Sequence, residues 1–296
     1  MNPSCLSDSD LPQVFHAADL AAVAGRRSYM AQTGARLVAA VVAAAAGVST
    51  MRLGQSTTDL AGLASSAAFL AALVLDVSLL RSRPERAWHD GRTLAESAKT
   101  LAWKWAVGGN PYSLAGGQGD ATVLLADDLL KLRSAVGAPK LQPVLGPVVS
   151  DAMRDLRAAP MDERRRIYLL DRVQRALTWY SGRAARSGRA ARRWRALLLG
   201  LEITGGVLGI LKATGAVDLP LDAVLASALG AVGAWLEAQQ HDQVADAYAI
   251  AIADLADAQV RLEAARDEQT WAMAVNDAEE AISSEHTRWR ASRSEP

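Results

Sequence analysis

The stretch LVAAVVAAAAGVSTM (37–51) begins the first of two apolar hairpins that decide the fold of this chain, and after a short polar gap LAGLASSAAFLAALVLDVSLL (60–80) completes it. The second hairpin consists of ALLLGLEITGGVLGILKA (196–213), another short gap and LPLDAVLASALGAVGAWL (219–236). A membrane-spanning helix needs about 20 mostly apolar residues, with about 17 as the lower limit. The second stretch has 21 residues, the third and fourth have 18 each, and the first, with 15, is marginal. We therefore predict four membrane spans in two helical hairpins.

Arginines stand outside both hairpins, whereas the turns within them hold few cations. The flanking arginines are Arg26, Arg27, Arg36, Arg81, Arg83, Arg86, Arg183, Arg186, Arg189, Arg192, Arg193 and Arg195. Basic residues concentrate on the cytoplasmic side of membrane proteins, so this bias predicts that both termini and the central region are cytoplasmic. The run from 183 to 195 is also expected to be attracted to anionic lipid. Small residues four apart, Gly205 with Gly209 and Ala226 with Gly230, favour close helix packing inside a membrane.

Composition narrows the class of protein. Half of the 296 residues are apolar but only 5% are aromatic, and alanine and leucine, which are good helix formers, carry the apolar content. We therefore expect an all-α, integral membrane protein. The formal net charge is zero, so there is no global electrostatic case for nucleic-acid binding. Four scattered histidines, one cysteine and no phosphate-binding loop suggest no catalytic residue, cofactor or metal, and we expect that the protein is not an enzyme.

Each half of the chain follows one plan, in which long amphipathic cytoplasmic helices flank an apolar hairpin. Near the C-terminus, a coiled-coil-like stripe steps by 4, 3, 4, 3 and 4 residues through Trp271, Val275, Ala278, Ile282, Glu285 and Trp289. Three prolines and two glycines within 137–147 indicate a boundary. We predict a first module at 10–136 with spans at 37–51 and 60–80, a linker at 137–150, and a second module at 151–293 with spans at 196–213 and 219–236.

Three segments beside the hairpins carry a family resemblance. They are AWHDGRTLAESAKTLAWKWAVGGNPY (87–112), MRDLRAAPMDERRRIYLLDRVQRALTWYSGRA (153–184) and AEEAISSEHTRWRASR (278–293). The first resembles the bacterial SLATT domain, a name that abbreviates SMODS- and SLOG-associating two-transmembrane effector. The other two resemble the opening and the C-terminal end of another SLATT subtype. The resemblance runs from about residue 11 to residue 293 and is similar to tandem proteins in which one subtype precedes another.

The resemblance implies a membrane effector of a bacterial conflict or antiphage system, which acts at the inner membrane by forming a pore. It offers no catalytic residues, and it implies a partner that makes or binds a nucleotide-derived signal. Because four thin spans cannot enclose an aqueous path alone, we expect a homo-oligomer. Two alternatives stay open. One is a non-conducting membrane scaffold that recruits a partner through its coiled helices, and the other is a soluble helical bundle with buried hairpins.

Two acidic residues interrupt the apolar stretches. A carboxylate within a membrane should face protein or water, so Glu202 and Asp76 are candidates for a pore-lining or gating acid. The alternative is that each lies near the cytoplasmic interface and is solvated or paired with an arginine. Trp194 and Trp235 stand at the ends of the third and fourth stretches, where interfacial aromatic residues gather.

The remaining candidates belong to the segments that carry the resemblance, and we expect structural roles for them. Glu96 and Lys99 are three residues apart on a predicted helix, and this spacing predicts an ion pair. Trp103, Trp179 and Trp289 are expected to pack within or between helices.

Overall fold

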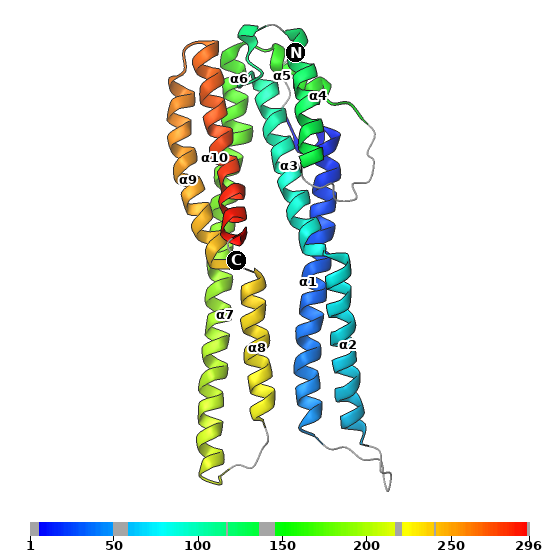
Figure 1. Ribbon diagram of the computed structural model, residues 1–296. Helices are drawn as coiled ribbons and strands as arrows, with labels where there is room; N and C mark the ends of the chain where they lie inside the picture. The colour runs from blue at the N-terminus through cyan, green and yellow to red at the C-terminus, as the bar shows by residue number, and fades with distance from the viewer. Residues whose placement is uncertain are drawn as a thin grey trace. The chain divides into compact units, whose positions relative to one another are not determined.

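All of the elements that the structure describes are helices. The structure is a computed structural model, and it describes residues 6–49, 59–116, 118–135, 146–216, 221–239 and 241–294. A π-helical turn, η3 (Tyr168–Gln174), joins two of the helices without a break. In chain order the α-helices are α1 (Gln13–Gly47), α2 (Leu60–Ser82), α3 (Pro84–Val107), α4 (Gln118–Ala135), α5 (Asp151–Ala158), α6 (Met161–Ile167), α7 (Arg175–Ala213), α8 (Asp222–Gln239), α9 (His241–Ala264) and α10 (Glu268–Ser294) (Figure 1).

The predicted apolar stretches lie within helices, close to the expected bounds. α2 begins at residue 60 as predicted, and α7 ends at residue 213, the last residue of the third stretch. α1 ends at residue 47, four residues before the predicted end, and α8 begins at residue 222. Residues 219 and 220 lie outside the described residues, as does most of the predicted linker, 137–150. The all-α expectation is thus confirmed.

The bounds of α2 have local causes. At its start, Asp59 accepts a hydrogen bond from the backbone N–H of Ala61 at 3.0 Å, which satisfies one of the free donors of the first turn. At its end, Arg83 adopts the left-handed conformation with φ 42° and ψ 52°, which stops the helix. A residue with a side chain rarely takes a positive φ. Pro84 then opens α3, because its fixed φ suits the first helical position.

The chain forms two compact units, each built from segments far apart in the sequence. Unit 1 comprises Met1–Gly25, Arg86–Ala185 and Ala245–Pro296, and unit 2 comprises Arg26–Glu85 and Arg186–Val244. The long helices α1 and α7 each contribute to both units. Each unit therefore draws on both halves of the chain.

Unit 1 contains a conventional hydrophobic core. Leu94 of α3, Leu125 of α4, Leu156 of α5 and Leu255 of α9 are each fully buried. The predicted stripe on α10 is confirmed for the four members whose side chains are described, because they are all buried: Trp271, Val275, Ala278 and Ile282. The side chains of Glu285 and Trp289 lie outside the described ones. The large apolar residues of these amphipathic helices thus face one another rather than solvent.

The C-terminus of α3 is held by three donors from elsewhere in unit 1. The indole N–H of Trp271 and the Nη1 of Arg164 both donate to the carbonyl of Val107, at 2.8 and 2.6 Å. Arg157 donates to the carbonyl of Trp105 and stacks over its ring at 4.8 Å. Carbonyls at a helix C-terminus have no partner within the helix and carry partial negative charge, so buried guanidinium groups stabilise them.

Unit 2 joins two helical pairs, α1 with α2 and α7 with α8 (Figure 1). The hydroxyl of Ser65 on α2 donates to the carbonyl of Ala43 on α1 at 2.9 Å. The two pairs meet where α8 packs on α1. There, a Cβ added to Gly34 would lie 3.5 Å from the ring of Trp235. The few buried side chains of unit 2 are small ones, such as Ala43 and Ala191.

Candidate functional site

The outer surface of unit 2 is strongly apolar. Phe69, Leu70 and Val74 on α2 are 61%, 62% and 66% exposed, and Ile203 and Ile210 on α7 are 68% and 67% exposed. A soluble protein rarely leaves so many neighbouring large apolar side chains in water. This exposure disfavours the soluble bundle with buried hairpins and suits helices whose outer surface meets lipid.

Three helical stretches are long and apolar enough to cross a membrane. They are Gln13–Gly47, Leu60–Val107, which joins α2 to α3, and Met161–Ala213, which ends with α7. In the second and third stretches, no residue of the most apolar 18-residue segment is buried. α8 is not among them, and its 18 residues include the polar Asp222, Glu237 and Gln239. The fourth span therefore stays a prediction.

Asp76 lies in an ion pair that bridges the first hairpin. Its Oδ1 accepts from Nη1 of Arg36 on α1 at 2.9 Å, and both side chains are partly exposed. The pairing matches the alternative in which an arginine compensates the carboxylate. A paired carboxylate is much easier to hold near a membrane than a free one.

Glu202 differs from Asp76, because it is exposed on α7. Among the residues that the structure describes, no hydrogen bond or ion pair reaches its carboxylate. The predicted small-residue pairs do not bring helices into close contact within the described chain. A Cβ on Gly205 would lie 4.0 Å from Leu225, and nothing lies within 4 Å of such an atom on Gly209 or Gly230.

Ala226, the fourth small residue of these pairs, is exposed on α8. Trp194 of α7 and Trp235 of α8 lie side by side, with ring centroids 6.3 Å apart. Indole rings with a polar N–H suit the boundary between lipid and water. The packing roles of the four small residues stay predictions that concern contacts with other molecules.

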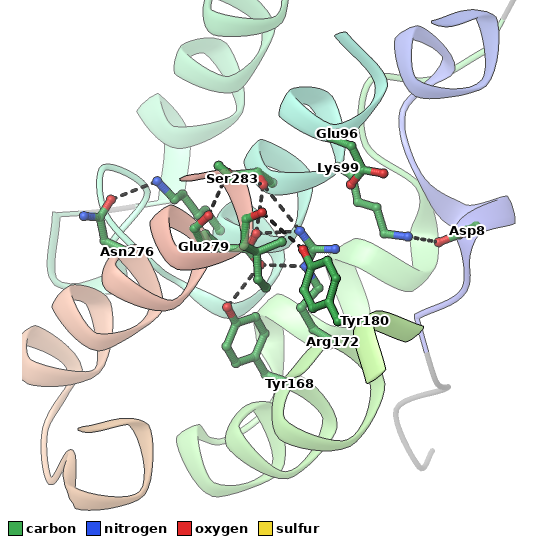
Figure 2. A network of polar contacts seen from close by, with 12 residues as sticks. Asp8, Glu96, Lys99, Tyr168, Arg172, Tyr180, Asn276, Glu279 and Ser283 are labelled. Carbon is green, nitrogen blue, oxygen red and sulfur yellow. Dashed lines mark hydrogen bonds and ion pairs between the residues drawn. The ribbon is translucent and has the colours of Figure 1, made fainter. Parts of the chain in front are cut away.

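Unit 1 contains a buried polar network around Glu279, which is fully buried on α10 (Figure 2). Its Oε1 accepts from Nε of Arg172 at 2.9 Å and from the hydroxyl of Tyr168 at 3.0 Å. Its Oε2 accepts from Nη2 of Arg172 at 2.7 Å and from the hydroxyl of Thr100 at 2.9 Å. The network joins α3, the π-helical turn and α10, and four charge-assisted hydrogen bonds compensate the buried carboxylate.

The electrostatics of this network keep Arg172 charged and Tyr168 neutral. Burial alone would lower the pKa of Arg172, but the adjacent carboxylate of Glu279 outweighs it and raises that pKa. Burial, together with the same carboxylate, raises the pKa of Tyr168 well above its ordinary value. Nearby, Lys104 donates to Asn276 at 2.8 Å, and burial lowers the pKa of its ammonium group.

A cavity of about 310 Å³ opens beside this network, and Arg172 lies in its wall. Four residues singled out from the sequence line it: Glu96, Lys99 and Trp103 from α3, and Trp179 from α7. The structure thus brings together residues from two of the three segments that carry the family resemblance. The side chain of Trp289 lies outside the described ones.

The predicted ion pair between Glu96 and Lys99 is wrong. Lys99 Nζ lies 2.6 Å from Asp8 Oδ1 in the N-terminal segment (Figure 2). Glu96 pairs instead with Arg92 at 2.8 Å on its own helix. A pair three residues apart is worth only a few tenths of a kcal/mol, so a tertiary partner easily displaces it. Lys99 therefore ties the N-terminal segment to α3.

Sequence reasoning missed Glu279 and Arg172, the centre of the network. One signal was available, because Glu279 lies four residues after Val275 and three before Ile282, inside the apolar stripe of α10. A charged residue on a buried face needs a charged or hydrogen-bonding partner. The identity of that partner, 107 residues away, carries no local signal.

Comparison with known protein families gives two matches. Residues 12–165 match the family model of SMODS and SLOG-associating 2TM effector domain 3, and residues 168–289 match that of SMODS and SLOG-associating 2TM effector domain 1. The first match alone covers more than half of the chain. Comparison with curated proteins and with solved structures gives no match.

Proposed function

The chain belongs to the SMODS- and SLOG-associating 2TM effector (SLATT) family, with two such domains in tandem, and from this premise we propose that it oligomerises in the bacterial inner membrane and forms a pore on activation. One observation carries the proposal. The large apolar side chains of α2 and α7 in unit 2 are exposed rather than packed against one another. In a bilayer such surfaces contact lipid or further copies of the chain.

In this proposal α1–α2 and α7–α8 are the two membrane hairpins. α8 is not among the three stretches that are long and apolar enough to cross a membrane, but it packs on α7 through Trp235 and on α1 through Gly34. Each module, 10–136 and 151–293, supplies one hairpin. The arginines outside the hairpins support cytoplasmic termini, because basic residues prefer that side of the membrane.

Several copies are needed to enclose an aqueous path, and Glu202 suggests which helix faces it. A carboxylate that faces lipid costs about 2.5–3.5 kcal/mol on insertion scales. An assembly that turns this face of α7 toward water would relieve that cost. Gly206 and Gly209, which have open space beside them, would let a neighbouring helix approach closely.

We further infer that the trigger comes from a partner. The family associates with SMODS and SLOG systems, and a sensor or a synthase of a nucleotide-derived signal fits that association. We propose that the partner or its signal binds to unit 1, because unit 1 contains the buried network and the cavity beside it.

Reconstitution of the purified full chain into liposomes that contain a self-quenching dye tests the pore. Because several copies must assemble, dye release should rise more steeply than the protein-to-lipid ratio. In planar bilayers, Glu202→Gln should reduce the selectivity for cations. Glu237→Gln, which removes an exposed carboxylate from α8, is the matched control and should leave selectivity unchanged.

The opposite result is equally clear. If protein that resists carbonate extraction releases no dye and carries no current at any protein-to-lipid ratio, the proposal that the protein forms a pore is wrong. The non-conducting scaffold would then account for the membrane hairpins, and it predicts a partner that co-purifies with the full chain.

A further inference from the structure

α7 has two different faces over residues 186–195. Ser187 and Ala191 are 8% and 2% exposed and pack inwards. Five exposed arginines cover much of the remaining helix surface, and we call them the arginine face: Arg186, Arg189, Arg192, Arg193 and Arg195. The helix thus presents five guanidinium groups outwards within three turns.

Four of these five cations have little compensation from the protein itself. From residue 172 to residue 201 the sequence contains no aspartate or glutamate. For Arg186, Arg189, Arg192 and Arg193, the structure gives no ion pair among the residues that it describes. By contrast, the exposed Arg154 of unit 1 is paired with an acid on its own helix. The arginine face therefore has an excess of positive charge, although the chain as a whole is neutral.

The position of the arginine face on α7 determines which part of a membrane it can contact. The same helix becomes apolar from residue 196, with Leu197, Leu199 and Ile203 exposed. At a rise of about 1.5 Å per residue, Arg192, Arg193 and Arg195 lie within about 6 Å of that point. A bilayer of about 40–45 Å with a hydrocarbon core of about 30 Å has a headgroup layer of about 5–8 Å on each side. These three arginines are therefore at headgroup depth.

The other two arginines lie farther out. By the same rise, Arg189 and Arg186 are about 10 and 15 Å from the start of the apolar stretch. The Debye length is about 8–10 Å at physiological ionic strength, so their attraction to the membrane surface is partly screened. The five residues thus differ in depth, and their contributions should differ accordingly.

We propose that Arg192, Arg193 and Arg195 bind the phosphate groups of anionic phospholipids, and that these lipids anchor α7 at a defined depth in the membrane. A guanidinium group donates two parallel hydrogen bonds to a phosphate, which an ammonium group cannot do. Trp194 lies between Arg193 and Arg195 in the sequence, and its ring contacts the ring of Trp235. Two indole rings therefore lie at the same depth as these arginines. This inference rests on the proposed insertion of α7 into a membrane.

A lipid is the partner that the observations favour over a nucleic acid. The arginine face is continuous with an exposed apolar face on one helix, and only a lipid offers a phosphate directly above hydrocarbon. A nucleic acid would leave Leu197 and Ile203 in water.

Quenching of tryptophan fluorescence by brominated lipids tests this directly, because Trp194 lies between Arg193 and Arg195 along α7. The full chain is reconstituted with brominated phosphatidylglycerol or brominated phosphatidylcholine, and the ratio of the two binding constants is measured. One arginine near an anionic surface is worth about a five-fold change in binding. The triple variant Arg192→Gln, Arg193→Gln and Arg195→Gln should therefore lose a preference for phosphatidylglycerol on the order of 100-fold.

Three further variants test the roles of hydrogen-bond geometry, depth and position. Replacing the same three arginines by lysine should retain part of the preference, because the charge remains but the paired hydrogen bonds do not. The double variant Arg186→Gln and Arg189→Gln should lose less than five-fold per residue. The matched control, with the same charge change on exposed arginines of unit 1, is Arg154→Gln, Arg166→Gln and Arg261→Gln, and it should leave the preference unchanged.

Several outcomes would overturn the inference. One is equal binding of both lipids by the unchanged protein. Another is an equal loss of preference in the control triple variant. Displacement of the anionic lipid by inorganic phosphate or by an RNA oligonucleotide at equal concentration would show that the face is not selective for lipid. Resistance to carbonate extraction is measured for every variant, so that a failure to insert counts against the proposed membrane function and not against the lipid contact.

Discussion

Replacing Glu279 by glutamine tests the buried network that joins three segments of unit 1. The carboxylate is fully buried and accepts four hydrogen bonds, two of them from Arg172 at 2.7 and 2.9 Å. Glutamine keeps the shape but removes the negative charge. The guanidinium of Arg172, which is only 5% exposed, then loses the anion that accepts two of its hydrogen bonds. Breaking a buried ion pair in this way costs about 3–5 kcal/mol, and we expect that loss in the free energy of unfolding.

Equilibrium urea unfolding of the full chain in detergent, followed by tryptophan fluorescence, measures this loss. The signal reports on unit 1 because Trp103 and Trp271 are buried there. Glu280→Gln makes the same chemical change at the next residue, which is exposed, and should alter stability by less than about 0.5 kcal/mol. The double variant Glu279→Met with Arg172→Met removes both charges and should recover most of the loss.

A loss below about 1 kcal/mol in Glu279→Gln would refute this reasoning, because it would mean that water or another group compensates Arg172. So would an equal loss in Glu280→Gln. If the double variant were as unstable as the sum of the two single ones, the two residues would act independently, and the short distances between them would carry no coupling energy.

Two further predictions concern single residues of unit 1. Gly91→Ala should lower the free energy of unfolding by about 1–3 kcal/mol, because the new Cβ would lie 2.8 Å from the backbone nitrogen of Ala22 on α1. Gly188→Ala in unit 2, whose Cβ would meet only a flexible side chain at 3.7 Å, is the control and should lose nothing in the same urea unfolding assay. Hydrogen bonds, first of all from the backbone of Thr270, hold the pKa of Asp267 below its usual 3.8, so Asp267 stabilises α10 above that pH, and its contribution is lost as the pH falls through the lowered pKa. Asp267→Ala should therefore unfold at a lower temperature than the unchanged protein near about pH 6, and the difference should narrow toward about pH 2; a constant difference across that range would contradict the role of the carboxylate.

Some features of the site were accessible from the sequence because they depend on neighbours along the chain. The stripe on α10 from Trp271 to Ile282 is buried as its spacing predicts, since residues three and four apart share one face of a helix. Trp103 and Trp179 were found through their sequence segments, and both line the cavity of unit 1. The prediction of an ion pair between Glu96 and Lys99 was wrong because it rested on helical spacing alone. Helical spacing shows which side chains can meet, but Asp8 arrives from a distant segment.

The sequence by itself determined the helical class, the places of the apolar helices and the family, because helix propensity, apolar length and family motifs are properties of contiguous residues. Only the tertiary structure decided that unit 1 and unit 2 each draw on both halves of the chain. It also decided that Arg172 would meet Glu279, and that Asp76 would pair with Arg36 while Glu202 stays exposed. The physical reason is the same in each case. A buried or membrane-embedded charge is stable only beside its partner, and which partner comes within about 3 Å depends on how helices pack, not on their spacing along the chain.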